Sequence, residues 1–176
     1  YEILIENDGN NFIYAPLVNY ADHTFSVCKK MLDDKNAIMG LGDGGAHVGF
    51  ILDAGYPTWL ISYWSVKKNV YSMEETVRRL TSDTANAAGL NDRGLLKVGL
   101  KADINIIDWE NVGSSDPFMT QDLPAGGKRL MQHTQGYVTT IVSGKVTYRN
   151  GEFTKERPGT VVKSVKDEEK TLEFIN

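Results

Sequence analysis

AIMGLGDGGAHVG, residues 37–49, joins a short apolar run to a glycine-rich loop. The run at 37–42 is too short for a helix, so it predicts a strand. A second apolar run, FIYAPLV at 12–18, lies between turn-forming residues and predicts another buried strand. Between the two runs, Asp22 can cap a helix with an apolar face formed by Phe25, Cys28, Met31 and Leu32. The order strand, helix, strand indicates a βαβ unit, a parallel sheet and therefore an α/β fold.

The composition is that of an ordinary globular protein, because 41% of the 176 residues are apolar and 24% are charged. The net charge of −4 and the lack of a lysine or arginine block argue against nucleic acid or an anionic membrane surface as a partner. No stretch approaches the roughly 18 apolar residues of a membrane span. The single cysteine, Cys28, excludes an internal disulfide and suits a reducing compartment, so we expect a cytoplasmic protein. The first residue is Tyr1 rather than Met, which indicates processing or a piece of a longer protein.

Helices are predicted in the middle of the chain. Pro57 suits the first turn of a helix, and Trp59, Tyr63 and Trp64 would share its apolar face as core residues. The pair Ser72 and Glu75 is a capping-box pattern that opens a further helix. A short helix at 83–88 is expected to stop at Gly89.

The later residues predict β structure. The stretch 95–108 indicates a turn and then a strand, whereas 109–135 is expected to be loop because it contains prolines and a Gly-Gly pair. Strands at 137–142 and 145–149 flank Ser143-Gly144, which is a hairpin signal.

The chain therefore divides into three parts. An α/β part covers 1–92, a β-rich part covers 93–165, and a charged tail covers 166–176. A second turn at Asn150-Gly151 lies in the β-rich part, and Asp92-Arg93 predicts a local ion pair at the boundary.

Asp43 is the first candidate for chemistry, because it follows a predicted parallel strand at the carboxyl end, where catalytic groups of α/β sheets gather. Gly44 and Gly45 allow a sharp turn and a close approach to a ligand. A carboxylate at this position can bind a metal ion or carry a proton. The alternative is that Asp43 only holds the turn through a side-chain hydrogen bond.

His47 lies in the same loop and can be a ligand, a proton donor or a substrate contact. The alternative is a histidine that is hydrogen-bonded within a packed loop. His23 and His133 are expected to be structural, and Cys28 fits the core better than a nucleophile. The sequence contains no H-x-H, C-x-x-C or H-E-x-x-H pattern, so it predicts no complete metal site.

The stretch from Leu41 to Gly49 resembles the loop after the eighth barrel strand of the amidohydrolase superfamily, and more narrowly of its D-aminoacylase / N-acyl-D-amino-acid deacylase branch. The order of later landmarks is similar to that branch, and the resemblance covers residues 10–162. These landmarks are Tyr56-Pro57-Thr58, Ser72 to Val77, Leu80 to Ala85, Gly89 to Gly94, Gly99 to Ile104, Asp122 to Gly127, Val142 to Val146, Asn150 to Glu152 and Arg157 to Gly159.

The resemblance implies a zinc-dependent hydrolase with a (β/α)₈ barrel and a small β-sandwich built from both chain ends. Asp43 matches the aspartate that sits at the metal and moves protons between water and the leaving amine. His47, Gly44 and Gly45 match the part of the loop expected to contact substrate. The other metal ligands would lie upstream of Tyr1, so the chain corresponds to the carboxy-terminal part of such an enzyme.

The same resemblance implies that the chain alone is inactive and binds zinc weakly or not at all. One segment departs from the family pattern, because Ser62 to Lys67 stand where a more basic, histidine-bearing helix is expected. This departure leaves the substrate preference open.

Three functions remain open at this point. The first is hydrolysis of non-peptide C–N bonds in N-acyl amino acids, in which a metal-activated water attacks the amide carbonyl and Asp43 passes the proton. The second is hydrolysis of a cyclic amide, as in hydantoinases or dihydroorotases, with the same role for Asp43. The third is a non-catalytic module for assembly or ligand binding.

The expected partners are a small-molecule amide substrate and a second copy of the chain, with neither nucleic acid nor membrane. A partial barrel would leave the strand at 12–18 with an unpaired edge, and open strand edges recruit partners. We therefore expect the isolated chain to form a symmetric dimer over that edge.

Overall fold

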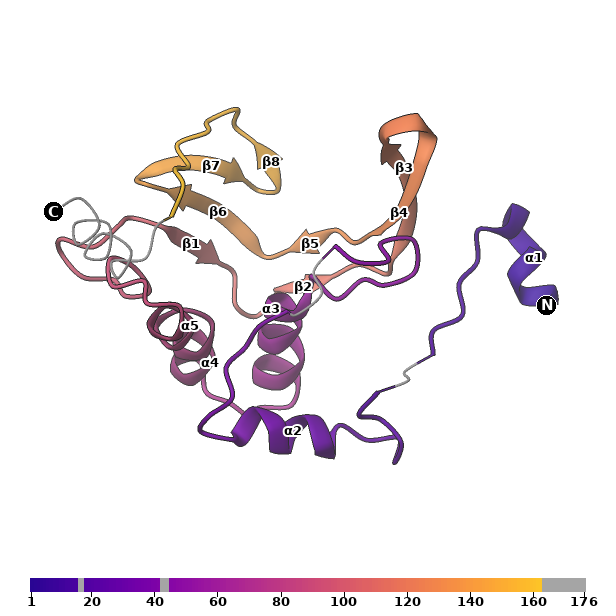
Figure 1. Cartoon of the computed structure of the whole chain (residues 1–176), viewed down its shortest axis with the longest axis horizontal. Coiled ribbons are helices and arrows are strands. Elements are labelled where there is room, and N and C mark those ends of the chain that lie inside the picture. Colours follow the sequence, from indigo (N-terminus) through magenta and orange to yellow (C-terminus); the bar gives the residue numbers. More distant parts are fainter. Residues whose placement is uncertain (16–17, 42–44, 163–176) are drawn as a thin grey trace, which may run out of the picture.

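The computed structural model describes residues 1–15, 18–41 and 45–162. The helices are α1 (Glu2–Gly9), α2 (Ser26–Asp33), α3 (Tyr56–Trp59), the π-helix η1 (Leu60–Lys67), α4 (Met73–Leu80) and α5 (Ser82–Ala87). The strands are β1 (Ile104–Ile107), β2 (Gly113–Ser114), β3 (Phe118–Leu123), β4 (Gly127–Met131), β5 (Thr134–Gln135), β6 (Tyr137–Val142), β7 (Lys145–Arg149) and β8 (Glu152–Phe153), with the 3₁₀ turn η2 (Pro124–Gly126) before β4. Figure 1 shows helices α2 to α5 on one side, the strands on the other, and α1 apart from both.

The helical core forms where η1 meets the segment before α4. Leu60, Trp64 and Tyr71 are buried there, and partly buried side chains of α2, including Cys28, pack against them. Cys28 is thus a packing residue, as expected. Among the predicted core aromatics Trp64 is only 4% exposed, but Trp59 is 39% exposed. The core prediction is therefore wrong for Trp59, whose ring stacks on Tyr63 with ring centroids 4.6 Å apart but keeps much of its remaining surface exposed.

Helix α4 begins with the predicted cap. The Ser72 hydroxyl accepts a hydrogen bond from the backbone N–H of Glu75 at 3.2 Å. The Glu75 carboxylate does not complete the reciprocal half of the box, because it binds Arg79 instead. One of the free N–H groups at the start of the helix is satisfied in this way.

Ser72→Ala is expected to lower the free energy of unfolding by about 1 kcal/mol, since the Glu75 N–H loses its acceptor. Ser114→Ala is the matched control, because Ser114 is exposed and its hydroxyl makes no hydrogen bond to another described residue. Urea unfolding of both variants measures the difference. Equal stabilities of the two variants would contradict the capping role.

The β part is built on a four-stranded antiparallel sheet in the order β1-β6-β7-β8. Both predicted turns are confirmed. Ser143 and Gly144 join β6 to β7, and Asn150 and Gly151 join β7 to β8, all four with positive φ. Positive φ at both central residues gives the turn that matches the twist of antiparallel strands.

The expectation of a loop over 109–135 is wrong. β3 and β4 form an antiparallel hairpin, and β2 pairs with β5. The prolines and glycines suggest a long loop, but they concentrate at the tip of the hairpin, where Pro124, Ala125 and Gly126 make a tight 3₁₀ turn. The flanking residues are free to pair, so the turn residues mark a hairpin rather than a long loop.

Polar contacts join the helical part to the β part. The hydroxyls of Thr58 and Tyr137 are 2.8 Å apart, which links α3 to β6. The predicted ion pair of Asp92 and Arg93 is present at 2.8 Å, and Arg93 also reaches Asp103 at 3.3 Å. Asp103 in turn accepts a hydrogen bond from the backbone N–H of Ser143.

The two predicted parallel strands are absent from the described residues of the first part. Residues 12–15 and 37–41 have no regular structure, and every described strand pair is antiparallel. The predicted βαβ unit is therefore not formed within the described residues, whereas the helix after Asp22 is present as α2. A strand exists only through hydrogen bonds to a neighbour, and the apolar runs have no neighbouring strand here.

The described residues before Thr58 are exposed or only partly buried. No described residue before Thr58 is buried, and Ile13, Tyr14 and Val18 are 61%, 86% and 76% exposed. The chain exposes 13415 Å² in all, whereas a folded monomer of its mass exposes about 8,600 Å². The exposed side chains Ile13, Tyr14 and Val18 give this part of the chain an apolar surface of the kind that marks an interaction site.

No helix within the described residues is both long enough and apolar enough to cross a lipid bilayer.

Candidate functional site

The predicted site falls on the segment between α2 and α3. Asp43 and Gly44 lie outside the described residues, so their proposed roles rest on the sequence. The structure describes the approach to them, residues 37–41, and the turn that follows, residues 45–51, which we name the His47 turn. Gly45 opens this turn with φ of +85° and no atom within 4 Å of a Cβ added there.

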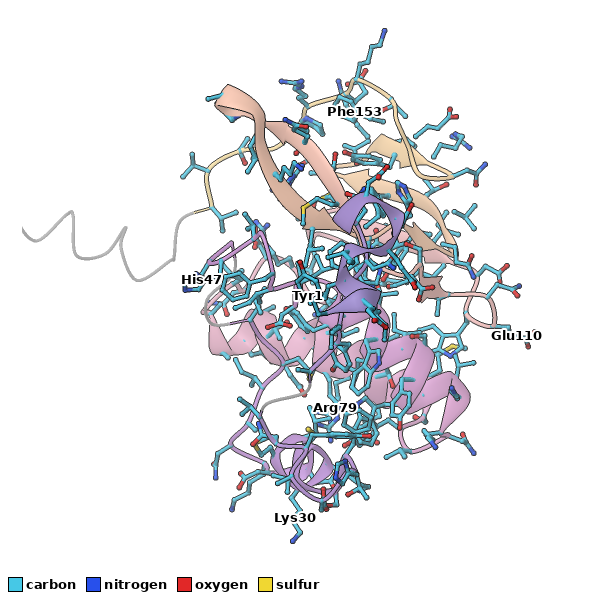
Figure 2. All side chains as sticks on the ribbon, turned by 90° about the vertical axis from the view of Figure 1, so that its right-hand side faces the viewer. Tyr1, Lys30, His47, Arg79, Glu110 and Phe153 are labelled. Carbon is cyan, nitrogen blue, oxygen red and sulfur yellow. The ribbon has the colours of Figure 1, made fainter. Side chains whose placement is uncertain are left out.

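His47 stands at the surface of this turn. Its backbone has φ of +50°, and its carbonyl accepts hydrogen bonds from the N–H groups of Phe50 and Ile51 at 3.0 and 2.9 Å. The imidazole is exposed and lies on the Phe50 ring with centroids 5.1 Å apart. Figure 2 shows His47 at the edge of the molecule. The backbone conformation thus points the imidazole outward, where a ligand or another part of the protein can reach it.

The middle of the His47 turn is attached to the β part. The carbonyl of Val48 accepts a hydrogen bond from the backbone N–H of Leu130 in β4 at 2.8 Å. Val48 is also partly buried, unlike the exposed His47 beside it. The turn is therefore fixed to the outer strand of the β3–β4 hairpin one residue after the histidine.

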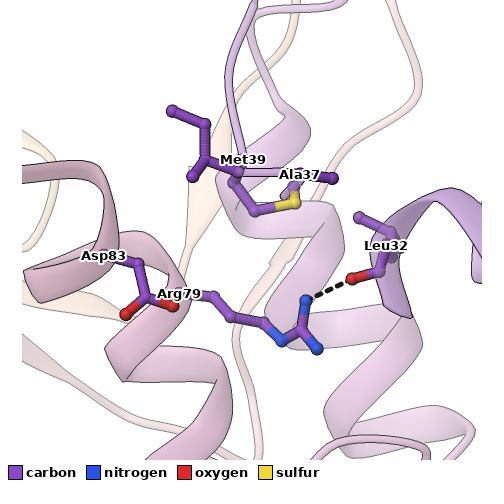
Figure 3. Close-up of a pocket in the computed structure, with 6 residues that line it drawn as sticks. Leu32, Ala37, Met39, Arg79 and Asp83 are labelled. Atoms are coloured by element: carbon purple, nitrogen blue, oxygen red, sulfur yellow. Dashed lines mark hydrogen bonds between the residues drawn. The ribbon is translucent and has the colours of Figure 1, made fainter. Parts of the chain in front are cut away.

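The near end of the segment is attached to α4 through Arg79. The guanidinium donates to the carbonyl of Leu32 at 2.5 Å and to the Glu75 carboxylate at 2.8 and 3.1 Å. It also lies over the Tyr71 ring, 4.5 Å from the centroid. Figure 3 shows Arg79 reaching from α4 to the end of α2, beside Ala37 and Met39. Arg79 thus satisfies a carbonyl at the carboxyl end of α2, where the helix has no partner of its own.

A small pocket lies behind this contact. It holds about 10 Å³, room for about one water molecule. Its lining comes from three places in the chain: Leu32 at the end of α2, the stretch Ala37–Met39, and Arg79 and Asp83 of α4 and α5. The approach to the predicted site therefore packs on the same side of α4 as the end of α2.

Charged groups reinforce this junction. The Tyr71 hydroxyl donates to Asp33 at 2.8 Å, and Lys29 forms an ion pair with the same carboxylate. The hydrogen bond from Lys29, and then that from Tyr71, lower the pKa of Asp33. Burial, and next the hydrogen bond to Asp33, raise the pKa of Tyr71. The tyrosine therefore stays neutral and the aspartate stays charged at neutral pH.

The other histidines lie elsewhere. His23 packs edge-on against Tyr20 before α2, and His133 lies against Phe118 with ring centroids 4.7 Å apart. Asp22 does not cap α2 directly but organises the turn before it, and hydrogen bonds from Thr24 and Ser26 lower its pKa to about 2. Within residues 1–15, 18–41 and 45–162, no three histidine, cysteine, aspartate or glutamate side chains lie close enough to hold a metal ion.

The contact by which Arg79 joins α4 to the end of α2 was not predicted from the sequence. The signal was present, because Arg79 follows the fully buried Thr76 by three residues on α4 and so shares its inward face. An arginine on the inward face of a short helix needs acceptors there. The acceptors are Glu75 on the same helix and a carbonyl that is distant in sequence, which no local pattern identifies.

Comparison with known proteins gives a family and a set of partial relatives. The sequence profile of the amidohydrolase family matches residues 15–148. A dihydroorotase of Lactobacillus acidophilus is 33% identical over 89 residues, and one of Bacillus cereus is 38% identical over 89 residues. A dihydroorotase of Bacillus thuringiensis is 37% identical over the same length.

In each of these three cases the match covers 48% of this chain and 20% of the relative. The chain therefore spans about a fifth of the length of the curated relatives it matches. No solved structure matches the chain.

Proposed function

Because the chain belongs to the amidohydrolase family, we propose that it is the carboxy-terminal part of a metal-dependent hydrolase that cleaves non-peptide C–N bonds of amides. The observation that carries this proposal is the family match over residues 15–148, which includes the Asp43 loop and strands β1 to β6. The order of sequence landmarks over residues 10–162 supports the same conclusion.

The fold of the complete enzyme is part of this proposal. Residues 1–92 would supply the last strands and helices of a (β/α)₈ barrel, residues 93–165 most of a β-sandwich, and residues 166–176 a charged tail. The open first part supports the assignment, since its apolar runs at 12–18 and 37–42 would become strands only beside the strands of an upstream polypeptide. The exposed apolar side chains of this part would then be buried.

Two substrate classes remain, and the curated relatives favour cyclic amides. The relatives compared above all carry the name dihydroorotase. Hydrolysis of N-acyl amino acids is the second candidate, supported by the D-aminoacylase-like order of landmarks in the sequence. Both reactions open a C–N bond and need a group that transfers a proton to the leaving nitrogen.

The residues of this chain would have distinct roles. Asp43 would accept the proton of the attacking water and deliver it to the leaving amine, and would be the one metal ligand that this chain supplies. His47, Gly44 and Gly45 would contact the substrate. The exposure of His47 supports this role, because a ligand can reach the imidazole.

The described residues do not fit a zinc site on their own. A catalytic zinc needs about three protein ligands, and no group of three donors converges within the described ranges. Zinc would therefore depend on ligands from upstream barrel strands, and its chemistry would be activation of the attacking water.

The test is an assay of the polypeptide in which the upstream barrel strands precede this chain. We expect it to hydrolyse cyclic amides such as dihydroorotate. Hydrolysis of N-acyl-D-amino acids alone would select the second candidate. Failure to hydrolyse any amide, with metal bound and the fold intact, would overturn the proposal in favour of a non-catalytic module.

We expect the 176-residue chain alone to self-associate, although not through a strand edge, since residues 12–15 do not form a strand. The reason is the set of exposed apolar side chains in the first part, among them Ile13, Tyr14 and Val18, which a second copy of the chain would cover. Light scattering at high micromolar concentration should show a dimer or a larger species.

Tyr14→Ser removes an 86% exposed aromatic ring from this surface and is expected to weaken the association. Val98→Ser is the control, because Val98 is fully exposed but lies far along the chain from the first part. A monomeric wild-type chain, or equal effects of the two variants, would contradict the prediction.

A further inference from the structure

We propose that Arg79 is a positioning residue for the His47 turn, which rests on the function proposed for that turn. The guanidinium does not touch the turn. It joins α4 to the end of α2 and borders the stretch Ala37–Met39, through which the chain passes from α2 toward the turn.

The first step of the argument is that Arg79 makes a contact that other side chains cannot reproduce. Its side chain is 15% exposed, and its planar guanidinium serves three partners at once: the Leu32 carbonyl, the Glu75 carboxylate and the face of the Tyr71 ring. A lysine has one compact ammonium group and cannot bind the carbonyl and the carboxylate in this planar arrangement while stacking on the ring.

The second step concerns what this contact holds. Leu32 lies in the last turn of α2, and residues 34–36 close a turn in which the Ala37 N–H donates to the Asp34 carbonyl at 3.0 Å. Met39 then packs partly buried against the helical core. The direction in which the chain leaves α2 is therefore set where Arg79 binds.

The third step is that the His47 turn has a second attachment. Val48 is bonded to Leu130 of β4 on one side of the predicted site, and Met39 packs at the helical core on the other side. A turn that is anchored on two sides has far fewer conformations than a turn that is anchored on one side. Releasing the Arg79 end would let the His47 turn sample positions in which the imidazole is misplaced.

Arg78 provides a matched control on the same helix. Its side chain is 53% exposed, and it forms an ion pair with Asp83 at 2.6 Å. Arg78→Ala removes the same charge and the same number of atoms as Arg79→Ala, but leaves the contact to Leu32 intact.

The first measurement is hydrogen–deuterium exchange on the 176-residue chain. Arg79→Ala is expected to speed exchange of the Phe50 and Ile51 amides, which donate to His47, at least about threefold, whereas Arg78→Ala leaves them unchanged. Arg79→Lys should behave like Arg79→Ala, because its charge does not restore the planar contact. Faster exchange confined to α2 and α4, or full rescue by lysine, would overturn the proposal.

The second measurement is kinetics of the complete enzyme. Arg79→Ala is expected to lower kcat about tenfold to a hundredfold while KM changes less than about twofold, since misplacement acts on the reacting geometry. Unchanged kcat beside faster exchange of the His47 turn would overturn the positioning role. Faster exchange of the turn in Arg79→Ala, together with a wild-type protein that hydrolyses no amide, would refute the proposed function and leave the attachment itself standing.

Discussion

Asp43→Asn in the complete hydrolase is expected to lower kcat by about a hundredfold to ten-thousandfold, the usual effect of removing a general acid–base group. The amide has nearly the size of the carboxylate, so the loop keeps its shape. It cannot accept a proton near neutral pH, and it is a poorer metal ligand. Steady-state kinetics on the substrate identified for the wild-type enzyme measures the loss.

Asp53→Asn is the control for this experiment, because Asp53 is an exposed carboxylate ten residues further on, before α3. Its variant should keep kcat within about twofold. Thermal unfolding of both variants should match the wild type, which separates lost chemistry from lost structure. Near-normal turnover of the Asp43 variant would show that the proton carrier is another residue.

Gly136→Ala is expected to lower the free energy of unfolding by about 3 kcal/mol. Gly136 has φ of +85°, and a Cβ added there would lie 2.6 Å from the Cα and 2.9 Å from the N of Val112. These are backbone atoms of a buried residue, so they cannot move aside as a flexible side chain does. The carbonyl of Gly136 also accepts a hydrogen bond from the Asp108 N–H at 2.7 Å, which holds the two segments at this spacing.

Gly144→Ala separates the strain of the left-handed backbone from the steric contact with Val112. Gly144 has φ of +78°, but no atom lies within 4 Å of its added Cβ. Its alanine variant bears only the strain of the left-handed backbone, about 1 kcal/mol. Urea unfolding of both variants should therefore give clearly different midpoints, and equal midpoints would refute the packing argument at Val112.

The sequence predicts those elements whose contacts are local. The turns at Ser143-Gly144 and Asn150-Gly151, the cap at Ser72 and the ion pair of Asp92 with Arg93 all involve residues within a few positions of each other. Their residue types are selected by backbone geometry or by a near neighbour. The structure confirms each of them.

The predicted strands that the described residues do not form depend on partners that are distant in sequence. The apolar runs at 12–18 and 37–42 have the composition of strands, but strand formation needs a neighbouring strand that the described chain does not provide. Distance in sequence also explains which parts of the candidate site the sequence could predict. The glycine-rich loop is identified by its own residues, whereas the contact from Arg79 to Leu32 joins residues 47 positions apart and has no local pattern.

The arrangement of the four-stranded sheet also has a kinetic consequence. Strands β6, β7 and β8 are linked by two-residue turns, whereas β1 ends at Ile107 and must find β6, which begins at Tyr137. Closing the longer connection costs about 2 kcal/mol more chain entropy than closing a two-residue turn. We therefore expect the three-stranded meander to form before β1 docks onto it, and the hydrogen bond from the Ser143 amide to Asp103 to form with that docking.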